Sequence, residues 1–155
     1  MSVFLFVGLV VLLVFTLEPG AKNKVELTGL LRGGDPDYQW YGKYVKLKNP
    51  QIKMSRNFAG NRMVIFSGII ENNGEKLLDA VEVELNFFNY DQLVLKTTRT
   101  PIRPGPGTYT PPIEPLEKRG FTLYMENIPK DWLASRAEMA IHGFRFLSQP
   151  SAQPQ

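Results

Sequence analysis

The chain has no cysteine and only one histidine, His142, among its 155 residues. The absence of cysteine excludes disulfide bonds, thiolate nucleophiles, sulfur ligands for a metal and a lipid-modified N-terminal cysteine. It does not indicate a compartment, because a cysteine-free chain fits either side of a membrane.

Sequence motifs of enzymes and of cofactor sites are missing as well. His142 stands in an expected strand, without a Gly-x-Ser-x-Gly motif or a cysteine to provide a nucleophile, and we expect it to be a half-buried strand residue. No spacing of possible ligands suits a transition metal. The glycine-containing segments 33–34 and 105–107 lack the lysine and the strand–helix context of a phosphate loop. We therefore predict no enzymatic activity, no metal site and no cofactor.

Charge is nearly balanced, with 18 Lys and Arg against 15 Asp and Glu and a net charge of +3. This excess is too small to indicate a nucleic-acid partner, and none is expected. The charges are unevenly placed, since residues 38–70 hold only bases and residues 71–91 hold mainly acids. Glu82 and Glu84 share one strand face, which we expect to be the solvent side of an amphipathic strand.

Long uncharged segments are also rare, with one exception at the N-terminus. Residues 2–17 carry no charged side chain, and Glu18-Pro19-Gly20 ends the run. A charge at the centre of a bilayer costs roughly 2.5–3.5 kcal/mol, and about 17–25 apolar residues cross a bilayer. We predict that residues 1–18 form a single-pass anchor in contact with membrane lipid. A cleaved signal peptide and a buried core helix are the alternatives, although no basic residue precedes the run and it has no polar face.

The side of the membrane on which the rest of the chain lies is left open by the charges. Lys22 and Lys24 follow the anchor, and by the positive-inside rule they favour a cytoplasmic domain. The family resemblance given below favours the opposite side of the inner, cytoplasmic membrane.

Hydrophobic alternation predicts strands over most of residues 38–147. Apolar and polar residues alternate from Val45, from Val81 and from Phe121, as in half-buried strands. Residues 62–70 are apolar at both parities, which predicts a central strand covered on both faces. The segment 139–146 changes parity, which indicates a bulge near Gly143.

Turn signals separate these segments and complete the predicted architecture. Residues 89–92 predict a hairpin turn, residues 33–36 predict a turn, and residues 129–136 predict the one short helix. We therefore predict an all-β chain, an antiparallel immunoglobulin-like β-sandwich preceded by one N-terminal transmembrane helix. The predicted divisions are a transmembrane anchor at 1–18, a linker or first strand at 19–37, a β-sandwich domain at 38–147 and a disordered tail at 148–155.

Part of this pattern resembles a known family. The stretch 66–74, with Gly68 and Asn72, resembles the apolar-x-Gly-x-apolar-x-Asn opening of bacterial FxLYD-type modules. The alternating stretch 81–91 matches the strand that ends in an aromatic-Tyr-Asp turn, although Gln92 replaces the usual Gly. Together with Pro115-Leu116-Glu117 the resemblance covers roughly residues 63–125. It implies a non-catalytic immunoglobulin-like sandwich on the outer side of a cell membrane.

Two segments are candidate binding surfaces. The first mixes aromatic and basic residues, which suits a membrane interface or a partner surface, and its alternative is ordinary packing with a solvated basic face. It comprises Tyr38, Trp40, Tyr41, Lys43, Tyr44, Lys46 and Lys48.

The second candidate is a loop at 101–120, which holds six of the 12 prolines, together with the expected helix at 129–136. A long proline-rich connection is stiff and suits docking, or it is only a rigid crossover between two sheets. Its tryptophan could equally cap the core. The candidate docking residues are Arg103, Pro104, Pro106, Tyr109, Pro111, Pro112 and Trp132.

These features favour a membrane-anchored β-sandwich that binds protein partners as an accessory or stabilising subunit of a membrane complex. The alternatives are a free-standing extracytoplasmic module that binds envelope components and a carrier that holds an apolar ligand between its sheets.

Overall fold

The computed structural model describes residues 27–104 and 110–147. The predicted anchor at 1–18 and the tail at 148–155 lie outside these residues. Within the described ranges, no helix has the length and apolar character needed to cross a membrane. The elements are β1 (Leu31–Arg32), α2 (Pro36–Tyr41), the 3-10 helix η1 (Gly42–Tyr44), β2 (Val45–Arg56), β3 (Arg62–Asn72), β4 (Leu78–Asn89), β5 (Gln92–Ile102), β6 (Lys118–Met125) and β7 (Arg136–Phe146).

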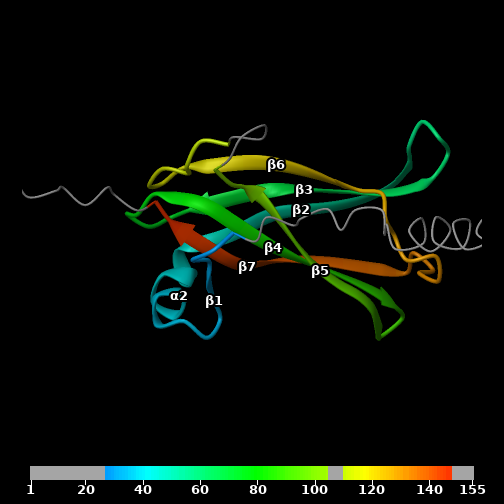
Figure 1. Ribbon diagram of the computed structural model, residues 1–155, viewed down its shortest axis with the longest axis horizontal. Coiled ribbons are helices and arrows are strands. Elements are labelled where there is room, and N and C mark those ends of the chain that lie inside the picture. Colours follow the sequence, from blue (N-terminus) through cyan, green and yellow to red (C-terminus); the bar gives the residue numbers. More distant parts are fainter. Residues whose placement is uncertain (1–26, 105–109, 148–155) are drawn as a thin grey trace, which may run out of the picture.

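The strands form two antiparallel sheets that face each other (Figure 1). One sheet has the order β1-β7-β4-β5 and the other β2-β3-β6. All strand pairs are antiparallel, which confirms the predicted all-β class. The short strand β1 lies in the segment 19–37, for which the sequence left a linker and a first strand open.

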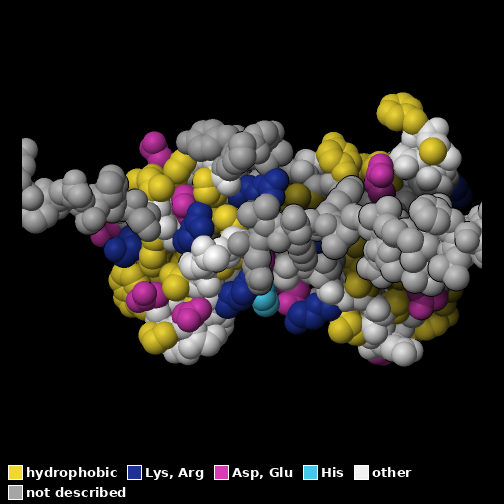
Figure 2. Space-filling model, viewed as in Figure 1, with side chains coloured by type: hydrophobic (Ala, Val, Ile, Leu, Met, Phe, Trp, Pro, Cys, Tyr) yellow, Lys and Arg dark blue, Asp and Glu magenta, His cyan; other side chains and the backbone are white. Residues whose placement is uncertain are grey.

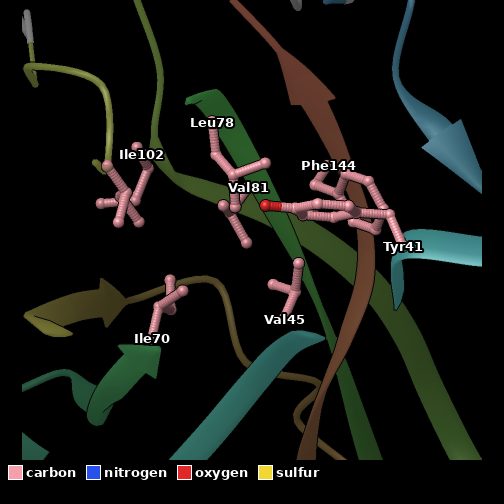
Figure 3. Close-up of a cluster of buried hydrophobic side chains, with 8 residues drawn as sticks. Tyr41, Val45, Ile70, Leu78, Val81, Ile102 and Phe144 are labelled. Carbon is pink, nitrogen blue, oxygen red and sulfur yellow. The ribbon is translucent and has the colours of Figure 1, made fainter. Parts of the chain in front are cut away.

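Side chains from both sheets fill the space between them in two clusters. The first surrounds Tyr41 and Phe144 at one end of the molecule (Figure 3). The second surrounds Phe66, Phe87 and Trp132 at the other end. Because β4 runs from Leu78 in the first cluster to its last residues beside Trp132, the two clusters lie at opposite ends of the sandwich.

Most of the predicted strands are present, because alternation of apolar and polar residues matches burial against a single core. The inward residues Val81, Val83 and Leu85 of β4 are completely buried. The central strand β3 lies between β2 and β6, as predicted, but its outer face is only half covered. Ile65 and Ile69 point to that face and stay partly exposed, because among the described residues no layer packs over them.

The predicted helix at 129–136 is wrong, and a helix forms instead at 36–41. Residues 130–131 form a turn, and Trp132 enters the core from an irregular segment. In α2, Pro36 occupies the first turn and Asp35 Oδ2 accepts a hydrogen bond of 2.6 Å from Arg32 N. Tyr38 and Tyr41 are three residues apart and both contact Phe144, which stabilises the short helix by tertiary packing.

The predicted bulge near Gly143 is confirmed. Glu82 pairs with Gly143 and Val83 pairs with Ile141, so His142 is the extra residue on β7. At this position β1 approaches β7 so closely that a Cβ on Gly143 would lie 2.9 Å from the carbonyl oxygen of Leu31. Glycine is therefore needed here for the pairing of β1 with β7.

Replacing this glycine tests the close approach. We expect Gly143→Ala to lower the unfolding free energy by about 1–3 kcal/mol, because backbone atoms cannot move aside as a flexible side chain can. Urea unfolding of the full chain in mild detergent, followed by tryptophan fluorescence, measures the effect. Gly33→Ala is the matched control, since a Cβ there meets nothing within 4 Å. Equal stability of the two variants would contradict the proposed contact.

Candidate functional site

One end of the sandwich, here called the α2 end, collects most of the residues that the sequence marks as candidates. It consists of α2, η1, the β3–β4 connection at 73–77 and the segment 110–117. These parts come together because β2, β4 and β6 start at this end, whereas β3, β5 and β7 finish there.

Tyr41 is the residue on which the α2 end is assembled. Its side chain is 1 % exposed, and its ring reaches from α2 into the core next to Phe144 (Figure 3). Its hydroxyl donates to Asn72 Oδ1 at 2.9 Å and accepts from the backbone N–H of Lys76 at 2.9 Å. Burial raises the pKa of this hydroxyl, so it stays protonated and keeps its donor. The predicted interface residue Tyr41 therefore holds the fold together and is not part of the surface.

Asn72 connects Tyr41 to the two neighbouring segments. It is completely buried, and its Nδ2 donates to Lys76 O at 2.8 Å and to Glu114 O at 3.1 Å. Its Oδ1 also accepts from the N–H of Gly74 at 3.3 Å. A Cβ on Gly74 would overlap the Tyr41 hydroxyl, so only glycine fits there. The Asn-Asn-Gly sequence thus provides a buried node in a connection between the two sheets.

The proline-rich loop is fastened to this node. It is a crossover, since β5 belongs to one sheet and β6 to the other, as one of the two interpretations expected. Ile113 is completely buried and pairs with Leu78. Arg119 donates to the carbonyl oxygens of Pro111 and Pro112 and forms an ion pair with Glu117 at 2.6 Å. Arg103 and Pro104 lie at the start of the loop, and Thr110 N donates to Arg103 O at 3.3 Å. Pro106 and Tyr109 lie outside the described residues.

The outer rim of the α2 end carries the side chains that a partner could reach. Trp40 is 54 % exposed and Leu116 is 75 % exposed. Next to Trp40 is a shallow hollow of about 410 Å³, and a second of about 570 Å³ lies beside Phe146, with Glu75 and Lys76 lining both. The predicted basic residues Lys43, Lys46 and Lys48 are exposed, whereas Tyr38 and Tyr44 are half buried.

Trp132 does not belong to this end. It is 3 % exposed, packs edge-on against Phe87 with ring centroids 5.0 Å apart, and its Nε1 donates to Phe88 O at 3.0 Å. The structure thus supports the alternative that Trp132 caps the core, and it separates Trp132 from the proline-rich loop.

The face of β4 with Glu82 and Glu84 is not the solvent side that the sequence predicted. Glu82 is only 5 % exposed and accepts from the Arg32 guanidinium at 3.0 and 3.2 Å. Glu84 pairs with Lys96 at 2.8 Å and with His142 Nδ1 at 3.1 Å. Acidic, basic and histidine side chains gather at the middle of this face (Figure 2). His142 is half buried there, as predicted, with its side chain 33 % exposed.

These side-chain contacts link all four strands of one sheet, because their members come from β1, β4, β5 and the bulge of β7. The hydrogen bond from Lys96, with a second from Asn86, holds the pKa of Glu84 below its ordinary value. Among the described residues no group of three or more His, Asp or Glu is placed to hold a metal ion. The arrangement therefore gives each carboxylate a cationic partner and a structural task.

Comparisons with protein-family models, with curated proteins and with solved structures find no match to this chain. The resemblance to FxLYD-type modules therefore stays a prediction.

Removing the Tyr41 hydroxyl tests the buried node. We expect Tyr41→Phe to lower the unfolding free energy by about 1–3 kcal/mol, because it leaves the Lys76 N–H and an Asn72 lone pair buried without a partner. Tyr44→Phe is the control, since its hydroxyl makes no hydrogen bond within the described structure. Urea unfolding of the full chain in detergent measures both, and similar midpoints would argue against a node at Tyr41.

The ion pair of Glu84 predicts a dependence of stability on acid. Because the folded-state pKa of Glu84 is below the ordinary value of 4.5, its stabilisation is present above that pH and is lost as the pH falls through the folded pKa. We expect Glu84→Gln to cost about 1 kcal/mol at neutral pH and progressively less below pH 4.5. Unfolding curves measured between neutral and acidic pH test this. For Glu75→Gln, at an exposed position, the difference in unfolding free energy from the wild type should not shrink as the pH falls. If it shrinks equally in both variants, the assignment of the effect to Glu84 is wrong.

Proposed function

We propose that the chain is a non-catalytic, membrane-anchored β-sandwich that acts as an accessory or stabilising subunit of a membrane protein complex. Residues 1–18 provide the anchor, and the α2 end binds the protein partner. The observation that carries the proposal is the combination, at one end, of a fully bonded interior with an exposed apolar rim.

The interior of the α2 end supports this proposal through its rigidity. Asn72 and Arg119 fasten the segments 73–77 and 110–117 to the sheets, so little conformational freedom remains to be lost on binding. Tryptophan is among the side chains enriched in residues that dominate binding energy, and Trp40 lies beside a hollow at this rim. Lys43, Lys46 and Lys48 add a basic border that would favour an acidic partner surface.

The finer fold assignment is immunoglobulin-like. The orders β2-β3-β6 and β7-β4-β5 agree with the A-B-E and F-C-C′ neighbours of such a sandwich, and β1 pairs on the free side of β7. The resemblance to FxLYD-type modules supports the same assignment, since its asparagine corresponds to the buried Asn72. The resemblance also favours the outer side of the inner membrane for the domain, whereas Lys22 and Lys24 favour the cytoplasmic side.

The alternatives from the sequence have less support. A carrier of an apolar ligand needs space between its sheets, and that space is filled by side chains such as Phe66, Phe87 and Phe144, which are completely buried. A free-standing module that binds envelope components would use the same rim and differs only in having no stoichiometric membrane partner.

Extraction of native membranes with mild detergent tests the proposal. We expect the full chain to migrate on a native gel in a complex much larger than its 17.6 kDa, and we expect Trp40→Ser with Leu116→Ser to release it. The loss of two apolar contacts at the centre of an interface commonly weakens binding by a factor of ten or more, about 1.4 kcal/mol or above. Tyr124→Ser, at a residue 66 % exposed on the outer face of β6, is the control. Migration of the wild type as a monomer would overturn the docking function.

A further inference from the structure

We propose that the end of the sandwich opposite α2 rests on the surface of a lipid bilayer, with three hydrophobic loop tips inserted at headgroup depth. The tips belong to the β2–β3, β4–β5 and β6–β7 connections and carry Phe58, Tyr90 and Leu133. This inference rests on the proposed anchoring by residues 1–18 and assigns the opposite end of the domain to lipid.

Phe58 is the most exposed large apolar side chain among the described residues. Its exposed fraction is 114 %, that is, the whole ring stands in solvent. The turn beneath it is nevertheless well ordered by hydrogen bonds, because Asn57 Oδ1 accepts from Ala59 N at 3.1 Å and from Asn61 N at 2.9 Å. A single exposed apolar side chain is ordinary, whereas several that project together at one end of a domain indicate contact with an apolar environment.

The other two tips are fixed to each other. Tyr90 is 77 % exposed and Leu133 is 66 % exposed. Asn89 Oδ1 accepts from Leu133 N at 2.7 Å, and Tyr90 N donates to Ser135 Oγ at 2.9 Å. Tyr90 has a positive φ of 55°, a strained conformation for this residue type, which the hairpin holds with its ring outward. All three tips are therefore built to project.

The shape and the charge of this end favour lipid over a folded protein. Separate convex projections fit a deformable bilayer surface better than a rigid partner, whose hot spots are contiguous and packed. Figure 1 shows where the β2–β3 hairpin turns, and a hydrophobic side chain projects at the same place in the space-filling view of Figure 2. The bases Arg56, Arg62, Lys130 and Arg136 are nearly balanced by the acids Asp91, Glu126 and Asp131, so we expect insertion to depend on apolar contact and only weakly on anionic lipid.

The tether is just long enough for this orientation when it is fully extended. Thr28 O accepts from Arg145 at 2.9 Å, and Arg145 pairs with Ala80 near the α2 end. From Ala80 to Asn89 the strand spans about 30 Å at roughly 3.3 Å per residue. Nine residues from the end of the anchor to Leu27 reach at most about 32 Å. The domain can thus stand with its tips on the bilayer and its α2 end, about one domain length away, facing the partner.

The absence of cysteine makes a site-specific test possible with the full chain. Ala59→Cys places one nitroxide label beside Phe58, and Glu75→Cys places one at the α2 end, both at exposed positions. The labelled chains are reconstituted in phosphatidylcholine vesicles and in vesicles with added phosphatidylglycerol. Collision rates with oxygen, which concentrates in lipid, and with a water-soluble nickel chelate then report immersion.

We expect the ratio of oxygen to nickel collisions to be several-fold higher at residue 59 than at residue 75 in both lipids. The combined change Phe58→Ser, Tyr90→Ser and Leu133→Ser in the Ala59→Cys chain should reduce the ratio to that at residue 75. Since these residues are exposed, the circular dichroism of this variant should match that of the parent. A ratio at residue 59 typical of water, in a chain that floats with the vesicles, overturns this inference and leaves the anchor intact. Immersion of residue 75 in place of residue 59 overturns it and assigns the α2 end to lipid. If the chain does not float with the vesicles, both the proposed anchor and this inference are wrong. If the tips are immersed but the native gel shows no large complex, only the proposed docking function is wrong.

Discussion

The hydrogen bond between the Tyr41 hydroxyl and the Asn72 amide is the interaction on which the described structure depends most. It joins α2, the helix that follows β1, to the last residue of the central strand β3. Without the other residue, each would lose one partner of a buried polar group, and a buried group left unsatisfied costs roughly 1–3 kcal/mol. Together the two side chains form hydrogen bonds with each other and with the backbone of residues 74–76. Asn72 also donates to Glu114 O and so fixes the segment 113–117. One pair of polar groups thus orders α2, the crossover between the sheets and the proline-rich loop.

The two ends of the sandwich differ because their aromatic residues are used differently. At the α2 end Tyr38 and Tyr41 pack against Phe144. The apolar side chains that stay exposed there are on the rim, at Trp40 and Leu116. At the opposite end Trp132 closes the core, and the loop tips around it carry their apolar residues outward. The first arrangement gives a stiff, shallow surface suited to a folded partner. The second gives separate projections suited to a bilayer.

Between the ends, the outer face of β4 is occupied by ion pairs. Glu82 and Glu84 are held by Arg32, Lys96 and His142, which come from three other strands. In β4, glutamates alternate with apolar residues along the sequence. From this pattern alone, the face that carries the glutamates looks like an ordinary solvent-exposed face. The side chains that cover this face all come from other strands, and Arg32 lies 50 residues from Glu82 in sequence, so only the pairing of the strands reveals them.

The wrongly predicted helix at 129–136 is a second case in which contacts between distant residues, which the sequence does not reveal, decide the structure. Pro129 and Pro36 are both placed for a first helical turn, and nothing local distinguishes them strongly. The helix forms at Pro36 because Tyr38 and Tyr41 can reach Phe144, whereas Trp132 is drawn into the core at Phe87 and interrupts its segment. Short helices take most of their stability from such tertiary contacts.

The sequence by itself determined what depends on neighbours along the chain: the all-β class, the alternating strands β4 and β6, the hairpin at 89–92 and the bulge at Gly143. Period-two alternation and turn residues act over a few positions, so one sequence is enough to recognise them. Only the tertiary structure decided which candidates share a surface. In the folded chain Tyr41 is buried, and Trp132 lies at the end opposite α2, together with Phe58, Tyr90 and Leu133. The sequence does not show this, because contacts between distant residues are set by how the two sheets pack.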